Sequence, residues 1–122
     1  MTTENIQCLS ADKLIELYER SAAKHAQATE RGDVQGVNMA ADRIAAIYHE
    51  LRRRGAHCQS LLLPLLDSSN AGVRGWAGAH AMEFAPEQGL VVLETLSRQP
   101  GWLGFTATMT IKVWREGDLR FP

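Results

Sequence analysis

The side chains able to act as acids, bases or metal ligands include four histidines and two cysteines. His80 and Glu83 share one helix face at i, i+3, so together they could supply two metal ligands or an acid–base pair. The other histidines, His25, His49 and His57, belong to different predicted elements, and no H-E-x-x-H motif occurs. Because the segment around His80 is largely apolar, we interpret His80 as a core histidine and Glu83 as a surface residue. The sequence therefore predicts no catalytic residue, no metal site and no cofactor.

Two further patterns resemble reactive sites but lack the required context. Cys8 and Cys58 lie far apart and outside any C-x-x-C spacing, so we expect two reduced thiols in a cytoplasmic protein. Gly72, Gly75 and Gly78 recur every three residues within a predicted helix. A phosphate-binding loop would need a turn there, so we interpret the three glycines as positions of close helix packing.

The charge balance limits the class of partner. The 122 residues carry 13 basic and 14 acidic side chains, a formal net charge of -1, with both signs in both halves. The sequence has no stripe of basic residues that could bind a phosphate backbone, so we expect no nucleic-acid partner. The run Arg52 to Arg54 should lie in the last turn of a helix, where cations meet the negative end of the helix dipole.

No apolar run approaches the ~20 residues of a membrane span. Residues 1–9 are polar and indicate neither a signal peptide nor an anchor.

The elements that position these residues begin with two long amphipathic helices. Ser10 can cap the first, which carries apolar residues at three- and four-residue steps and ends at Gly32. Asp33 can cap the second, whose apolar face continues to Gly55. Because the link between the helices is minimal, residues 10–55 should form an antiparallel hairpin.

Shorter and more apolar segments follow this hairpin. Three helices are predicted, over residues 57–66, 71–85 and 86–99. Pro64 should kink the first or mark its first turn, Asn70 can cap the second, and Pro86 opens the third. The second is apolar nearly all round, so we expect it to be buried nearly all round, with neighbours on more than one side.

The stretch from Gly104 to Gly117 alternates apolar and polar residues, which favours a β-strand on propensity alone. However, no other segment has a strand pattern, and a lone strand would leave its backbone groups without partners. Ala107, Ile111 and Trp114 also fit a helix face. We therefore predict a sixth helix over residues 106–116, capped by Thr106.

Six helices in three antiparallel pairs resemble a HEAT-like α-α superhelix. The stretch from Leu61 to Met82, with its leucine pairs, turn aspartate, Val-Arg dipeptide and alanines, is similar to the HEAT repeat pattern. Residues 61–117 also resemble the small bacterial HEAT-like family named domain of unknown function two thousand and nineteen. The positions that carry this likeness are Val73-Arg74, Ala77 to Phe84, Ala85-Pro86-Glu87, Leu90, Leu93, Gly104-Phe105, Ala107 and Trp114-Arg115. The resemblance implies a fold and no established activity.

Five residues are predicted to have structural roles: Asp67, Arg74, Trp76, His80 and Trp114. Arg74 lies in the first turn of a helix, where the dipole disfavours a cation, so an acceptor such as Asp67 or a neighbouring carbonyl should compensate. Trp76 and Trp114, with Trp102, could form a recognition surface, but aromatic residues at helical spacing favour core positions.

We expect one domain over residues 1–122. Its predicted parts are a flexible N-terminus (1–9), the hairpin (10–55), the HEAT-like helices (56–117) and a tail (118–122). Such a stack indicates a noncatalytic module that binds another protein. One role open to it is that of the immunity-type partner of a bacterial toxin. The candidate contact residues are the charged ones on the first helix: Glu16, Glu19, Arg20 and Lys24.

The alternative function is an enzyme on a HEAT-like scaffold, such as a glycosylase of damaged bases. That chemistry needs a basic concave face with an aromatic and acidic pocket, which the near-neutral charge disfavours.

Overall fold

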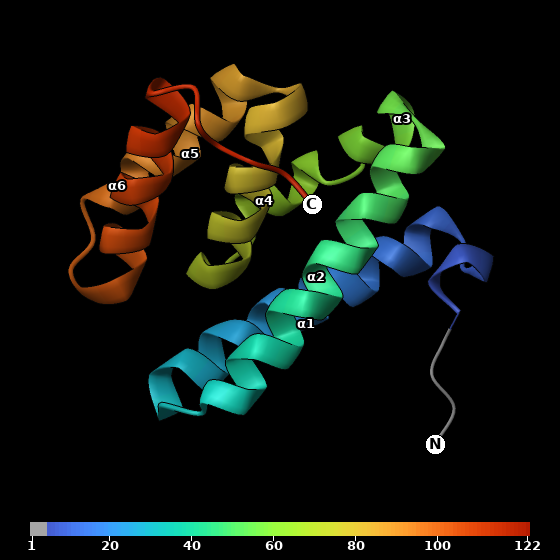
Figure 1. Ribbon diagram of the computed structural model, residues 1–122, viewed down its shortest axis with the longest axis horizontal. Coiled ribbons are helices and arrows are strands. Elements are labelled where there is room, and N and C mark those ends of the chain that lie inside the picture. Colours follow the sequence, from blue (N-terminus) through green and yellow to red (C-terminus); the bar gives the residue numbers. More distant parts are fainter. Residues whose placement is uncertain (1–4) are drawn as a thin grey trace. The chain divides into compact units, whose positions relative to one another are not determined.

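The computed structural model describes residues 5–122, which divide into two compact units (Figure 1). Unit 1 runs to Leu61 and contains four elements: η1 (Ile6–Cys8), α1 (Ala11–Arg31), α2 (Val34–Arg54) and α3 (Ala56–Ser60). Unit 2 runs from Leu62 to Phe121 and also contains four: η2 (Leu63–Asp67), α4 (Ala71–Phe84), α5 (Pro86–Ser97) and α6 (Gly101–Arg115). None of the described residues forms a β-strand. The predicted all-α architecture of paired helices is confirmed, while folding of the whole chain as one domain stays a prediction.

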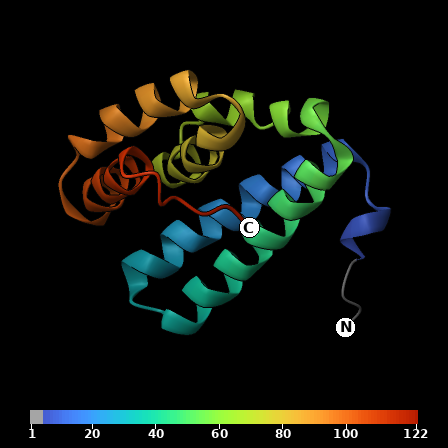
Figure 2. The same cartoon turned by 45° about the horizontal axis from the view of Figure 1, so that its top comes forward.

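Unit 1 is built on the predicted hairpin, in which α1 and α2 lie antiparallel and side by side (Figures 1 and 2). Both predicted N-caps are confirmed. Ser10 Oγ accepts a hydrogen bond from the Lys13 N–H at 3.2 Å, and Asp33 Oδ1 accepts one from the Gly36 N–H at 3.0 Å. Gly32 ends α1 with a φ of 68°, a left-handed conformation that favours glycine. Local sequence signals therefore determine both helix starts and the turn between the helices.

Large side chains fill the interior of unit 1. Those buried from the two long helices include Leu14, Leu17, Tyr18, Ile44, Ile47, Tyr48 and Leu51. From α3, Gln59 Nε2 donates a hydrogen bond to the Tyr48 hydroxyl at 3.0 Å in this interior. Burial, and secondarily the Tyr48 phenol, raises the pKa of Tyr18 well above its usual value. The phenol of Tyr18 therefore stays neutral within the apolar core at physiological pH.

The segment predicted as one helix over residues 57–66 forms two short elements. α3 ends at Ser60, and the 3₁₀-helix η2 begins at Leu63 with Pro64 in its first turn. Proline has no N–H to donate, and its ring clashes with the carbonyl four residues earlier, so an α-helix cannot continue unbroken through Pro64. The single helix was wrong, whereas the placement of Pro64 in a first turn is confirmed.

Helix α4 has the predicted burial. Glu83 is its one exposed residue, and the others are buried or half-buried. The helix contacts η2, α5 and α6, so it has neighbours on several sides. Asn70 forms the predicted cap, because its Oδ1 accepts hydrogen bonds from the N–H groups of Gly72 and Val73 at 2.9 and 3.2 Å.

Glycine allows α4 and α5 to approach closely. A Cβ atom built on Gly89 of α5 would lie 2.7 Å from the carbonyl oxygen of Gly78 in α4. A Cβ atom on Gly78 would lie 3.3 Å from Val92, whereas one on Gly75 would meet only Leu96 at an ordinary 3.7 Å. The interpretation as a close-packing position therefore holds for Gly78, while Gly75 has room for a methyl group.

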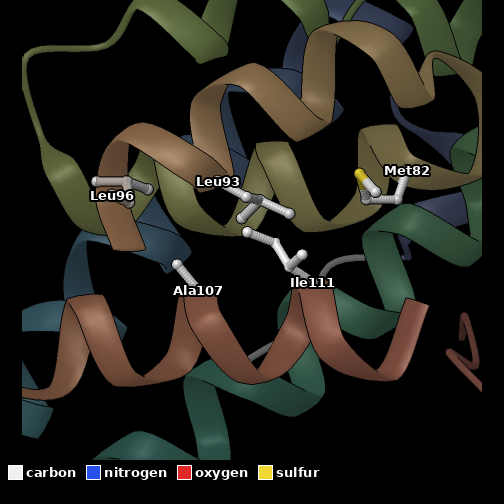
Figure 3. Close-up of a cluster of buried hydrophobic side chains, with 5 residues drawn as sticks. All are labelled: Met82, Leu93, Leu96, Ala107 and Ile111. Carbon is white, nitrogen blue, oxygen red and sulfur yellow. The ribbon is translucent and has the colours of Figure 1, made fainter. Parts of the chain in front are cut away.

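The core of unit 2 lies where α4, α5 and α6 meet. Figure 3 shows five buried side chains from these helices: Met82, Leu93, Leu96, Ala107 and Ile111. Trp114 packs against this cluster, and so do Leu119 and Phe121 of the segment predicted as a tail. Apolar contacts therefore hold Leu119 and Phe121 against the helices of unit 2.

The alternating stretch is helical, as predicted, but α6 begins at Gly101 with Pro100 at the N-cap position. The prediction that Thr106 caps the helix was wrong, since Thr106 lies in its second turn and its carbonyl accepts from Thr110 Oγ1 at 2.9 Å. Thr108 Oγ1 donates in the same way to the carbonyl of Gly104 at 2.8 Å. These bonds satisfy the hydroxyls of β-favouring residues within a helix.

Candidate functional site

The histidines differ in their surroundings. His80 is buried in α4, with 4% of its surface exposed, and its ring centroid lies 5.9 Å from that of Trp76. His25 is half-buried in α1, where burial lowers its pKa, whereas His49 and His57 are exposed. Across residues 5–122, no group of three or more His, Cys, Asp or Glu side chains is arranged to hold a metal ion. His80 and Glu83 differ in burial, as expected from the sequence.

Arg74 has an acceptor of the predicted kind. Its Nη1 donates to the backbone carbonyl of Ser68 at 2.7 Å, which links α4 to the turn that follows η2. Asp67, one residue before Ser68, is exposed at the end of η2. The neighbouring carbonyl that the sequence offered as one alternative is therefore the acceptor seen here.

The three tryptophans have intermediate exposure. Trp76, Trp102 and Trp114 are each half-buried, so none belongs wholly to the core or to the surface. Trp114 packs against the core of unit 2. Its predicted structural role agrees with that contact.

The charged residues proposed as partner contacts lie on the exposed side of α1. Glu16, Glu19, Arg20 and Lys24 are all exposed, and Glu16 pairs with Lys13 at 3.6 Å. The spacing of the four places them along one side of the helix. They form an available charged surface, and an exposed ion pair of this kind adds little stability.

A buried carboxylate in α2 was missed by the sequence prediction. Glu50 is 3% exposed, and its Oε1 and Oε2 accept hydrogen bonds from Arg53 at 2.9 and 2.6 Å. Glu50 Oε2 also accepts from Arg54 Nε at 2.7 Å, and Arg54 Nη2 donates to the carbonyls of Ile6 and Gln7. The signal was present in the i, i+3 and i, i+4 spacing of one acid and two bases.

Arg52, Arg53 and Arg54 lie in the last turn of α2, as predicted, and they make further contacts there. The hydrogen bond from Arg53, with further contributions from Arg54, lowers the pKa of Glu50 from 4.5 to about 2, although burial acts in the opposite direction. The guanidinium of Arg52 lies 5.8 Å from the centre of the Tyr48 ring. The three arginines therefore make internal contacts at the end of α2.

A shallow groove lies between η2 and α5 in unit 2. Its apolar residues are Leu63, Leu66, Val91 and Val92, and its polar residues are Asp67, Glu87 and Gln88. The groove has a volume of about 440 Å³. Val91 is 66% exposed. We call this feature the acidic-rimmed groove, because both of its ionisable residues are carboxylic acids.

The sequence carried one signal for this groove. Val91, Val92 and Leu93 are consecutive, and successive residues of a helix point about 100° apart, so they cannot all face one core. Leu93 is buried and Val91 is exposed.

A second groove, between α5 and α6, has mixed charge. It is lined by Glu94, Ser97, Arg98, Thr108, Ile111, Lys112, Arg115 and Glu116. Arg115 Nη2 lies 3.8 Å from Glu94 Oε1, a long ion pair between two largely exposed side chains.

Elsewhere on α6, Phe105 is 68% exposed and Met109 is 37% exposed. Unit 2 therefore exposes large apolar side chains on both α5 and α6.

Within the described part of the chain, no helix combines the length and apolar character needed to cross a membrane.

Comparison with known proteins supports the fold and gives no activity. No known protein family matches the chain, and none of the curated proteins does. Among solved structures, the protein RPA1889 from Rhodopseudomonas palustris CGA009 is similar, with a TM-score of 0.90 and 19% sequence identity. The match covers 98% of this chain and 100% of RPA1889. At this identity the likeness shows the shared all-α fold alone, and the family resemblance noted from the sequence stays a prediction.

Proposed function

We propose that this chain is a noncatalytic helical module that binds another protein. The observation that carries the proposal is the acidic-rimmed groove, in which four apolar residues line one open surface feature of unit 2. Single exposed apolar residues are common on soluble proteins, but apolar residues gathered in one groove are typical of binding sites. Burial of such a surface by a partner would provide the main favourable term in association.

Two other observations support protein binding over the enzyme alternative. The formal charge of -1 gives no general attraction to nucleic acid. In addition, Arg53 and Arg54 are engaged by Glu50, so the densest group of bases in the sequence is partly neutralised. A cytoplasmic location belongs to the same proposal, and the free thiols of Cys8 and Cys58 are consistent with it. Neutralisation of a toxin would be one narrower form of this binding role.

Photo-crosslinking in cells that naturally express the protein tests the proposal. A photoreactive phenylalanine analogue would replace Val91, Phe105 or Glu19 in turn, which samples α5, α6 and α1. We expect a covalent adduct with one defined polypeptide from at least one position. Absence of a specific adduct from all three positions would contradict the proposal. Salt-sensitive binding of duplex or single-stranded nucleic acid in a mobility-shift assay would favour the enzyme alternative instead.

A further inference from the structure

The acidic-rimmed groove has a defined chemical character. Four of its lining residues are aliphatic, two are carboxylic acids and one is an amide, and none is basic. Asp67 and Glu87 are both exposed, so their carboxylates are accessible to a partner. The groove therefore combines a desolvatable apolar surface with two acidic side chains and no basic one.

The spacing of these residues gives the groove a helical repeat on both sides. On η2, Leu63 and Leu66 are three residues apart, and side chains at i and i+3 of a 3₁₀-helix lie on the same side. On α5, Glu87 and Val91 are four residues apart, as are Gln88 and Val92. Each side thus presents apolar and polar groups within about one helical turn, so apolar contacts and charges lie next to each other along the groove.

The charge and shape of the groove disfavour nucleic acids, anionic lipids and small molecules as occupants. Two carboxylates repel nucleic-acid phosphates and the head groups of anionic lipids. The groove is open to solvent and shallow, so it would leave much of a small molecule exposed, whereas small-molecule sites bury most of their ligand. A basic polypeptide segment satisfies both properties, because its apolar side chains can cover the valines and leucines while Lys or Arg meets the carboxylates.

We infer that the acidic-rimmed groove binds a basic amphipathic helix of a partner protein. This inference rests on the proposed function, and it specifies the site and the chemical class of the partner. The apolar face of the helix contacts Leu63, Leu66, Val91 and Val92, and flanking lysines or arginines pair with Asp67 and Glu87. The apolar contacts supply most of the affinity, and the charges supply selectivity for basic over acidic helices.

Fluorescence anisotropy with two labelled synthetic peptides tests the inference on the full chain. One 18-residue peptide has leucines at i, i+3, i+4 and i+7 and lysines elsewhere, and the second has glutamate in place of each lysine. We expect the lysine peptide to bind at least tenfold more tightly than the glutamate peptide, and the preference to shrink at high salt. Equal affinity for the two peptides would overturn the inference.

Charge-matched variants locate the binding on the protein. The double variant Asp67→Asn, Glu87→Gln should weaken binding of the lysine peptide about three- to tenfold, the effect of losing two exposed charge pairs. The control Glu30→Gln, Asp42→Asn changes the net charge equally at exposed residues of α1 and α2, and it should change the affinity less than twofold. Equal weakening by both double variants would show that only net charge matters and would overturn the inference.

A second pair of variants tests the apolar surface. Val91→Arg should weaken binding of the lysine peptide at least tenfold, because it places a bulky cation where an apolar side chain docks. Val34→Arg in α2 is the control, since Val34 is 71% exposed and lies in unit 1. Circular dichroism and thermal melting confirm that each variant is folded. Unchanged affinity of the folded Val91→Arg variant would overturn the inference.

The crosslinking experiment separates failure of this inference from failure of the proposed function. A natural partner captured through Phe105 or Glu19, with no adduct at Val91, would support protein binding and contradict this use of the groove. A partner captured at Val91 through a segment that is acidic or lacks an amphipathic helix would contradict the partner class alone. Capture through a basic amphipathic helix supports both proposals.

Discussion

Unit 1 and unit 2 both have large apolar side chains in their cores, but they differ in helix length, in capping and in the use of glycine at a helix contact. The interior of unit 1 is filled by tyrosine, leucine and isoleucine from two long helices with side-chain caps. In unit 2, glycine and alanine bring shorter helices into close contact, and neither α5 nor α6 has a side-chain cap. Local signals therefore determine much of unit 1, whereas unit 2 depends more on the fit between its helices.

Both units expose some large apolar side chains. Val34 and Met39 of α2 are exposed in unit 1, and Val91 and Phe105 are exposed in unit 2. What sets Val91 apart is that it lines a groove together with other apolar residues, an arrangement that is useful where a partner covers it.

Among these substitutions, the largest change in the free energy of unfolding should come from one at the close contact between α4 and α5. Gly89→Ala places a methyl group 2.7 Å from the carbonyl oxygen of Gly78, so the backbone of one helix must move. We expect a loss of about 2 kcal/mol in the free energy of unfolding, within the range for overpacking and despite the higher helix propensity of alanine. Urea denaturation followed by circular dichroism measures this loss. Wild-type stability would show that packing in unit 2 is looser than the structure indicates.

The next largest loss of stability should come from a substitution in the cluster of Glu50, Arg53 and Arg54 in unit 1. Glu50→Gln keeps the shape of the side chain but removes the charge that meets Arg53 and Arg54. Breaking a fully buried ion pair costs about 3–5 kcal/mol, but Arg53 is 56% exposed and screened by solvent, so we expect about 1–2 kcal/mol at pH 7. Denaturation of wild type and variant side by side gives the difference. Glu16→Gln, which alters only an exposed pair, is the control.

The stabilisation by Glu50 should depend on pH. Its pKa is lowered from 4.5 to about 2 in the folded chain, so the folded state binds fewer protons than the unfolded state between these values. The contribution is complete above pH 4.5 and is lost progressively as the pH falls toward about 2. The stability difference between wild type and Glu50→Gln should therefore be constant from neutral pH to about 5 and then shrink. A constant difference down to pH 3 would contradict this account.

A smaller effect is expected from Arg74→Ala, which removes the hydrogen bond to the Ser68 carbonyl at 2.7 Å. Loss of a partly buried bond from a charged donor costs about 1–2 kcal/mol, reduced here by the unfavourable helix dipole at the start of α4. We expect a loss near 1 kcal/mol and a lower melting temperature. Arg20→Ala, on the exposed side of α1, should have less effect, and equal melting temperatures for the two variants would contradict the prediction.

The smallest expected change is an increase in stability. Gly75→Ala adds a methyl group whose nearest neighbour outside its own helix is Leu96 at 3.7 Å, an ordinary contact. Alanine is favoured over glycine inside a helix by up to about 1 kcal/mol, so we expect stabilisation by about 0.5 kcal/mol in urea denaturation. Destabilisation by Gly75→Ala as large as that by Gly89→Ala would show that every helix contact in unit 2 is tight.

The sequence by itself determined the helix starts and stops that depend on neighbouring residues. Ser10, Asp33 and Asn70 cap helices because their side-chain oxygens reach N–H groups two or three residues away. Gly32 ends α1 for an equally local reason. The apolar periodicity of the long helices also indicated their buried faces, since that pattern is a property of each helix alone.

Only the tertiary structure decided the features that depend on residues distant in sequence or on the packing of whole helices. The choice of helix over strand for residues 106–115 is one such feature, because the alternating pattern allows both and the helix places Ala107 and Ile111 in the core of unit 2. The acidic-rimmed groove joins Leu63 and Leu66 to Val91 and Val92, which no sequence spacing relates. Propensity and periodicity act over a few residues, whereas a groove or a helix contact depends on which surfaces meet once the chain has folded.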